Sequence, residues 1–150
     1  MDNKEYRTAP EQKAEGEGAA GQERAAAPAG MDFREAMGLK KVEAGDGRAK
    51  CEMEVQPFHN NILGILHGGV LFSIADTTSG MAVLTVAGDH VNTVSGNINY
   101  LRPGKDTAKI VAEAEVVKCG STLAVVDCRI MDDKGVLLAT TTMTFYIFAA

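Results

Sequence analysis

An acidic residue, Asp76, directly follows the otherwise apolar run Val70–Ala75 and could do chemistry. Burying a carboxylate without a partner is costly, so a residue of this kind needs either a hydrogen-bond partner or a function. Two interpretations stay open from the residues alone. Asp76 could bind nearby backbone or Thr77, or it could be one of the perturbed carboxylates that gather in active sites.

A second candidate is His67-Gly68-Gly69, which directly precedes the same run. Glycines at a helix start let backbone N–H groups approach another atom closely, and those N–H groups have no partner inside the helix. The helix dipole also favours developing negative charge there. This is the geometry of an oxyanion hole for an ester or thioester carbonyl. The alternative is a Gly-Gly turn with His67 as a simple helix cap.

The spacing of these two candidates constrains how they could work together. His67 and Asp76 are nine residues apart, which is about 13 Å along a helix. The two side chains therefore cannot reach one reacting atom within a single chain. If both act, the acid must come from a second subunit across an interface.

The segment that carries both candidates, 68–87, is predicted to be one long helix. It is about long enough to cross a bilayer. However, Asp76 stands at its centre, five hydroxyl residues follow or precede it, and no basic cluster flanks it. A helix that is apolar all round is typical of a core, so we predict a buried helix of a soluble protein and no membrane partner.

The remaining pattern predicts a short helix, a strand pair and, after the long helix, four strands. Asp32 with Glu35 indicates the start of the short helix, and Gly38 indicates its end. The predicted strands span residues 39–42, 48–55, 91–101, 107–118, 122–131 and 136–148, with a loop at 57–66. The last three strands should pair as a meander.

One helix with a mostly antiparallel sheet predicts an α+β fold in which the sheet wraps around the helix. Such a sheet has free edges and a second face that no helix covers. Pairing of sheet edges between two copies would solve this, so a homodimer is expected.

Composition excludes several classes. The chain has 150 residues, enough for one domain, and 15 basic against 20 acidic residues give a net charge of -5, which argues against nucleic acid as a partner. Three cysteines without a CxxC pair indicate no disulfide framework and a reducing cytoplasm. Three histidines without paired spacing predict no metal site.

The first 30 residues differ from the rest of the chain. They contain six acids and almost no large apolar side chain, so residues 1–30 are predicted to be a disordered Ala/Gly/Glu-rich tail and not a targeting sequence. Residues 31–150 are predicted to form the folded domain.

The motif Asn61-xx-Gly64-xx-His67-Gly68-Gly69-xx-Phe72-xx-Ala75-Asp76, followed by TVSGNINYLRP at 93–103, resembles the hotdog-fold acyl-CoA thioesterases of the phenylacetic-acid-pathway (PaaI-like) type. The resemblance covers about residues 35 to 148. It implies a curved antiparallel sheet of five to six strands around one long central helix. It also implies edge-to-edge dimers that often pair into homotetramers.

The resemblance implies a role for each residue of the motif. Asp76 would be the nucleophile or general base toward the thioester, and the Gly68 N–H would polarise its carbonyl. His67 would hold the turn and assist the carbonyl or the leaving thiolate. Asn61 would help place the attacking water, although the neighbouring Asn60 is an alternative, and Thr93 would orient water near the acid. Asn61, His67 and Gly68 would come from one subunit, and Asp76 and Thr93 from its mate.

The implied substrate is an acyl- or aryl-acyl-CoA, hydrolysed without metal or organic cofactor. The residues expected at the CoA entrance are Gly69, Arg102, Lys105, Lys118, Ser121 and Thr122, each of which is otherwise an ordinary solvated turn residue. Phe72, Met81 and Leu84 could line an acyl pocket or belong to the core. The alternatives are a non-catalytic acyl-CoA binding or sensing module and a hotdog dehydratase or hydratase.

Overall fold

The computed structural model describes residues 30–88 and 90–148, so the predicted tail lies outside it except for Gly30. The helices are α1 (Phe33–Ala36), the short 3-10 helix η1 (Pro57–His59) and α2 (Gly68–Ala87). The strands are β1 (Leu39–Gly45), β2 (Arg48–Glu54), β3 (Val91–Tyr100), β4 (Lys109–Cys119), β5 (Leu123–Asp132) and β6 (Leu137–Ile147). The predicted set of elements is confirmed, and η1 is an addition inside the predicted loop.

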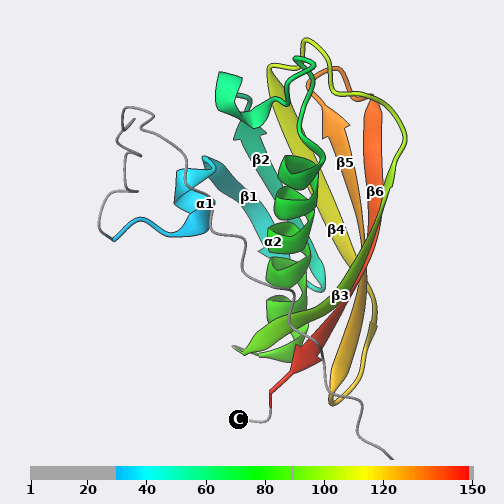
Figure 1. Ribbon diagram of the computed structural model, residues 1–150. Helices are drawn as coiled ribbons and strands as arrows, with labels where there is room; N and C mark the ends of the chain where they lie inside the picture. The colour runs from blue at the N-terminus through cyan, green and yellow to red at the C-terminus, as the bar shows by residue number, and fades with distance from the viewer. Residues whose placement is uncertain (1–29, 89, 149–150) are drawn as a thin grey trace, which may run out of the picture.

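All six strands form one antiparallel sheet in the order β1-β2-β4-β5-β6-β3. The predicted meander of β4, β5 and β6 is confirmed. β3 pairs with β6 and forms the far edge, so the chain crosses from one edge of the sheet to its interior between β3 and β4. The sheet curves around α2, which lies in its concave face (Figure 1). This confirms the α+β prediction and the hotdog arrangement that the resemblance implied.

The core lies between α2 and the inner face of the sheet. Side chains of a strand alternate between its two faces, and every second residue of the central strands is buried. The helix contributes Ile74, Ala75, Ala82 and Val83, none of which is exposed. Although α2 is long and apolar enough to cross a membrane by length and composition, its buried residues belong to this core.

The outer face of the sheet is charged. Cross-strand ion pairs join Arg48 to Glu115 at 2.7 Å and Lys50 to Glu113 at 2.8 Å. Exposed pairs of this kind contribute little to stability, because water screens both charges. Their main consequence is to keep this face of the sheet polar without a covering helix.

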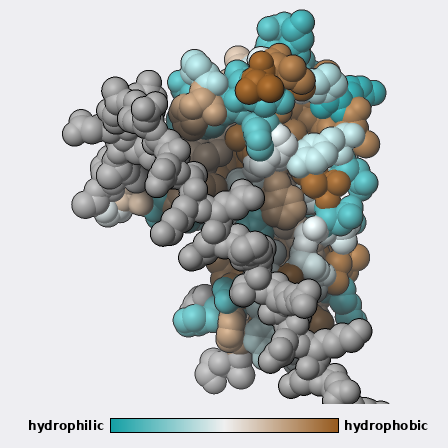
Figure 2. Space-filling view, viewed as in Figure 1, coloured by the Kyte–Doolittle hydropathy of each residue, from teal (hydrophilic) through white to brown (hydrophobic). Residues whose placement is uncertain are grey.

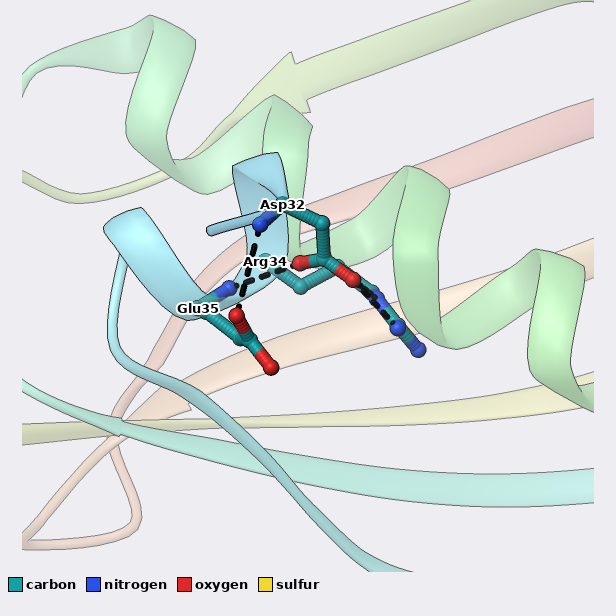
Figure 3. A network of polar contacts seen from close by, with 3 residues as sticks. All are labelled: Asp32, Arg34 and Glu35. Atoms are coloured by element: carbon teal, nitrogen blue, oxygen red, sulfur yellow. Dashed lines mark hydrogen bonds and ion pairs between the residues drawn. The ribbon is translucent and has the colours of Figure 1, made fainter. Parts of the chain in front are cut away.

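The short helix α1 begins with the predicted capping box. The Asp32 side chain accepts the Glu35 N–H at 2.9 Å, and the Glu35 side chain accepts the Asp32 N–H at 3.3 Å (Figure 3). Arg34 pairs with the same Asp32 carboxylate and is the main cause that lowers the pKa of Asp32. Gly38 follows with φ of +71°, the left-handed conformation that ends a helix.

β1 is longer than predicted, because it runs to Gly45 instead of ending near Val42. The turn into β2 is therefore only Asp46 and Gly47, both with positive φ (51° and 76°), the geometry of a tight two-residue hairpin. β1 is an edge strand with mostly exposed residues, so it lacks the alternation that would have indicated its length.

Apolar side chains are exposed on η1 and on the loop between it and α2. Phe58, Ile62 and Leu63 have exposed fractions of 66%, 102% and 75%. Hydrophobic surface is visible at this upper end of the molecule (Figure 2). This loop leads directly into His67, so the apolar surface adjoins the start of α2.

Candidate active site

The start of α2 leaves one backbone donor free. His67 is the N-cap, and its Nδ1 atom accepts the Gly69 N–H at 2.9 Å. The His67 carbonyl accepts the N–H groups of Val70 at 2.9 Å and Leu71 at 3.4 Å. Among the residues that the structure describes, the Gly68 N–H has no hydrogen-bond partner. The cap interpretation of His67 and the oxyanion-hole interpretation of Gly68 are therefore compatible, because the cap satisfies the neighbouring donor.

The cap also determines where the proton of the His67 ring lies. Because Nδ1 accepts a hydrogen bond, the neutral ring carries its proton on Nε2. His67 is exposed, so this N–H is available to a ligand. The residue before Gly68 thus offers a second donor at the start of α2.

Tyr100 is a site residue that the sequence did not single out. Its hydroxyl donates to the Gly68 carbonyl at 3.0 Å. A Cβ atom at Gly68 would lie 2.8 Å from the Tyr100 oxygen, which no real side chain tolerates. Any larger residue here would therefore have to displace this ring or the start of the helix. In the sequence, Tyr100 is only a residue near the end of a predicted strand. Whether its side chain faces the helix cannot be decided before the pairing of that strand is known.

Asn61 holds the loop that precedes the helix. Its Oδ1 atom accepts the Leu63 N–H at 2.8 Å and the Ile65 N–H at 3.4 Å, and Gly64 follows with φ of +70°. Its side-chain NH2 group has no partner within the described part of the chain. Asn60 instead pairs with Leu66 through a backbone bridge.

A cleft of about 530 Å³ joins these groups. Of the sequence-predicted site residues, Asn61, His67, Gly68, Gly69 and Arg102 line it. Tyr100 lines it as well. Arg102 is held there by a bond from its guanidinium to the Leu137 carbonyl at 3.3 Å.

Asp76 and Thr93 form a separate pair outside that cleft. The Thr93 hydroxyl donates to Asp76 Oδ1 at 2.7 Å, so the partner of the acid is on β3 and is not the adjacent Thr77. Asp76 is half-buried and Thr93 is exposed. Eight residues of helix separate Asp76 from Gly68, which is about 12 Å. The structure thus forms the predicted site in two halves. Asn61, His67 and Gly68 lie together at the cleft, and Asp76 lies with Thr93 elsewhere in the same chain.

Lys118, Ser121 and Thr122 lie at the other end of the sheet from the cleft. The β1–β2 turn marks that end, because Gly47 bonds both Thr85 near the end of α2 and Val116 on β4. Lys118 follows Val116 on β4, and the next turn carries the other two. Lys105 lies near the cleft, since it forms a bridge with Ile65.

The interpretation of Phe72, Met81 and Leu84 can be refined. Phe72 and Met81 are partly buried and pack against the core, whereas Leu84 is 41% exposed. Phe72 lies over Gly96 of β3, where a Cβ atom would come within 2.9 Å of its ring. Within residues 30–88 and 90–148, no three or more His, Cys, Asp or Glu side chains cluster in a way that could hold a metal ion.

Comparison with known proteins gives the family. Residues 63–139 match the thioesterase superfamily model, and human acyl-coenzyme A thioesterase 13 is 40% identical over 95 residues, which are 62% of this chain and 68% of that protein. A mutant of the phenylacetic acid degradation protein PaaI from Thermus thermophilus has a TM-score of 0.72 at 30% identity, covering 77% of this chain and 98% of that one.

A third relative has been solved with a ligand. The structure of a hypothetical thioesterase from Streptococcus pneumoniae with coenzyme A has a TM-score of 0.69 at 29% identity, over 74% of this chain and 86% of that one. The family match spans the start of α2, the Asp76–Thr93 pair and the central strands. The chain belongs to the thioesterase superfamily, on a hotdog fold.

Proposed function

We propose that this protein hydrolyses the thioester of an acyl- or aryl-acyl-CoA to the free acid and CoA, at a site shared by two protomers. The proposal is supported by the superfamily match and by the 40% identity to an acyl-coenzyme A thioesterase. The observation that carries it is the free Gly68 N–H in a cleft that contains no carboxylate, while Asp76, which Thr93 of β3 binds, lies about 12 Å along the same helix.

The chemistry follows from these two halves. The thioester carbonyl binds in the cleft, and its oxygen accepts the Gly68 N–H, with the His67 Nε2–H beside it. Asp76 of the second protomer acts as general base or nucleophile. As a base it takes a proton from water, the hydroxide adds to the carbonyl carbon, and the C–S bond breaks to release the CoA thiolate, which is then protonated. The Thr93 hydroxyl occupies one carboxylate oxygen of Asp76 and leaves the other for this work.

The edge strand β3 offers a route to the shared site. It starts at Val91 near the end of α2 and ends at Tyr100, which contacts Gly68 at the start of α2. Antiparallel pairing of two β3 edges about a two-fold axis would therefore set the Gly68 end of one protomer level with the Thr93 end of the other. We propose this homodimer, and a homotetramer formed as a dimer of dimers.

The same pairing would bring together the predicted CoA-binding residues, which lie at opposite ends of one chain. Gly69 and Arg102 lie in the cleft, and Lys118, Ser121 and Thr122 lie at the end of the molecule that the partner would bring to it. All five could then meet one CoA. A reducing, cytoplasmic location is proposed from the three free cysteines, Cys51, Cys119 and Cys128.

The first experiment measures thiol release from a panel of short, medium and aromatic acyl-CoA thioesters. We expect turnover by the wild type and a loss of about 10³-fold or more in kcat for Asp76→Ala, with CoA affinity retained. Asp127→Ala is the matched control, because Asp127 makes a similar bond to a threonine, Thr142, at 2.6 Å on the outer face of the sheet. Wild-type turnover by Asp76→Ala would show that the acid is wrongly assigned. Binding without thiol release would establish a sensing module instead.

A second experiment tests whether the site is shared. Asp76→Ala and Gly68→Pro are each expected to be inactive; proline lacks the N–H but suits the first position of a helix, although Tyr100 must move. Co-refolding the two variants should recover about a quarter of wild-type activity, because half the dimers are mixed and each has one intact site. Absence of recovery despite mixed dimers in native mass spectra would exclude the shared site.

A further inference from the structure

His59 closes the turn η1, which precedes the loop that leads to His67, with both its backbone and its side chain. Its backbone N–H donates to the Gln56 carbonyl at 2.9 Å, and its ring Nδ1 accepts the Gln56 N–H at 3.0 Å. The ring is only 1% exposed, in contrast to the neighbouring Phe58, whose ring meets it edge-on. The imidazole is therefore the inner side of η1, and it locks residues 56–59 in one conformation.

This turn is bonded directly to the start of the candidate active site. The His59 carbonyl accepts the His67 N–H at 2.9 Å. His67 immediately precedes Gly68, whose free N–H is the proposed oxyanion donor. Asn60 and Leu66 form a bridge alongside, so the chain from 59 to 67 is a closed loop with its ends together. A shift of His59 would move the peptide that joins His67 to Gly68.

The ring also carries a buried polar atom that packing alone does not explain. Because Nδ1 is an acceptor, the proton of the neutral ring lies on Nε2, and this buried atom has no hydrogen-bond partner among the described residues. Burial lowers the pKa of His59, and a weak contact of the ring with the Met37 backbone, outside normal hydrogen-bond geometry, raises it in part. An apolar side chain would avoid the cost of burying this N–H but would lose the Nδ1 acceptor, so the histidine is explained by the turn that it closes at Gln56.

We propose that His59 is a positioning residue for the Gly68 oxyanion donor, acting through the hydrogen bond that its turn makes with His67. The inference rests on the proposed thioesterase activity. Misplacing a catalytic group by about 1 Å can cost on the order of 100-fold in rate, so a residue that touches no substrate can still control kcat.

The test compares three variants that differ in which ring atom they replace. His59→Asn keeps an acceptor at the position of Nδ1, His59→Gln moves the polar group to the position of Nε2, and His59→Leu keeps neither. We expect kcat to fall about 10- to 100-fold in His59→Leu and His59→Gln, with KM changed by less than about threefold, and His59→Asn to restore most of it. His90→Asn removes an exposed histidine and is the control.

Amide hydrogen exchange at His67 gives a readout that does not depend on turnover. Exchange should accelerate in His59→Leu and His59→Gln and stay near the wild-type rate in His59→Asn, with all rates compared at equal global stability. If His59→Leu does not fold, the Asn and Gln pair decides the question. Equal kcat in those two variants, or an unchanged His67 exchange rate in His59→Gln, would overturn the inference. A wild type that releases no thiol would instead refute the proposed function.

Discussion

At the residue scale, the missing side chain of Gly68 matters as much as its N–H group. The Tyr100 ring occupies the space where a Cβ atom would stand, and its hydroxyl binds the Gly68 carbonyl. The two peptide groups that flank the one carrying the free N–H are thus held, the Gly68 carbonyl by Tyr100 and the His67 N–H by the turn at His59. Gly69 is less constrained, because its Cβ would meet only the His67 ring, at 3.0 Å.

The first prediction concerns Gly68→Ala. The new Cβ atom would lie 2.8 Å from the Tyr100 oxygen, so either the ring or the helix start must shift. We expect kcat to fall about tenfold or more and stability to drop by about 1–3 kcal/mol, measured by steady-state kinetics and denaturant unfolding. Gly45→Ala is the matched control, since a Cβ there has nothing within 4 Å. Equal kcat in the two variants would contradict this account.

The second prediction is a pH dependence of stability that belongs to His59. Burial lowers the pKa of His59 in the folded state, so below a pH of about 6.5 the unfolded chain binds a proton that the folded chain resists. The free energy of unfolding should therefore fall as pH drops from 7 to 5. His59→Asn should show a shallower decline in urea titrations over the same range. Parallel curves for the two proteins would show that His59 is protonated equally in both states.

The third prediction concerns the cysteines. Burial raises the pKa of Cys128 to about 12 and also raises the pKa of Cys51, whereas Cys119 is exposed. Only one thiol per folded chain should react with a disulfide reagent at pH 8, and all three should react after denaturation. Cys119→Ser should abolish the native reaction, which also removes the background from a thiol-release assay. Rapid labelling of Cys51 or Cys128 in the folded protein would contradict the burial described for them.

At the element scale, a bulge in β3 determines that the Thr93 side chain faces Asp76. Thr93 pairs with Phe145 and Ser95 with Thr144, so Val94 is an extra residue on the β3 side. Inward-facing Gly96 would, by strict alternation, place Val94 inward and Thr93 outward. The bulge reverses this phase, and Thr93 reaches Asp76 as a result.

The fourth prediction follows from the bulge. Deleting Val94 removes the extra residue but leaves Thr93 opposite Phe145, so the protein should fold and keep at least about a tenth of its activity. Deleting Asn97 changes the phase of the strand and turns Gly96 away from Phe72, so folding or activity should be lost. Melting curves and kcat measure both. The opposite order of tolerance would show that Val94 is not the bulged residue.

At the scale of the whole molecule, one chain completes its fold but not the proposed site, and β3 is left as an exposed edge of the sheet. Its residues are exposed along nearly the whole strand, and Val94 is 59% exposed. The inner face of the sheet is filled by α2, so the chain folds around its own core. The carboxylate and the free N–H nevertheless stay in different places, which a second copy paired along β3 would bring together.

The fifth prediction is therefore a link between association and activity. Light scattering should give a mass of at least twice the 15.9 kDa of one chain, and dilution below the dissociation constant should lower specific activity in step with the dimer fraction. Ser95→Lys, on the outer side of the edge strand, should weaken pairing through like-charge repulsion across the two-fold axis. Lys50→Ser, far from this edge on β2, is a control. A fully active monomer would refute the shared site.

Local patterns in the sequence were sufficient to predict most elements. The alternation in β2 and β4, the apolar run of α2 and the Asp32–Glu35 capping box all act between near neighbours, so their consequences are visible in the chain itself. The spacing between His67 and Asp76 also predicted that one chain could not bring both to one atom, because helix rise per residue is constant.

Contacts between distant segments were decided only by the tertiary structure. The length of β1, the place of β3 beside β6, the Thr93–Asp76 bond, the Tyr100 ring against Gly68 and the buried His59 all depend on which strands become neighbours. A sequence records periodicity and spacing along the chain, whereas sheet order, a bulge or a ring packed on a glycine arises from contacts between segments that the chain brings together only when it folds.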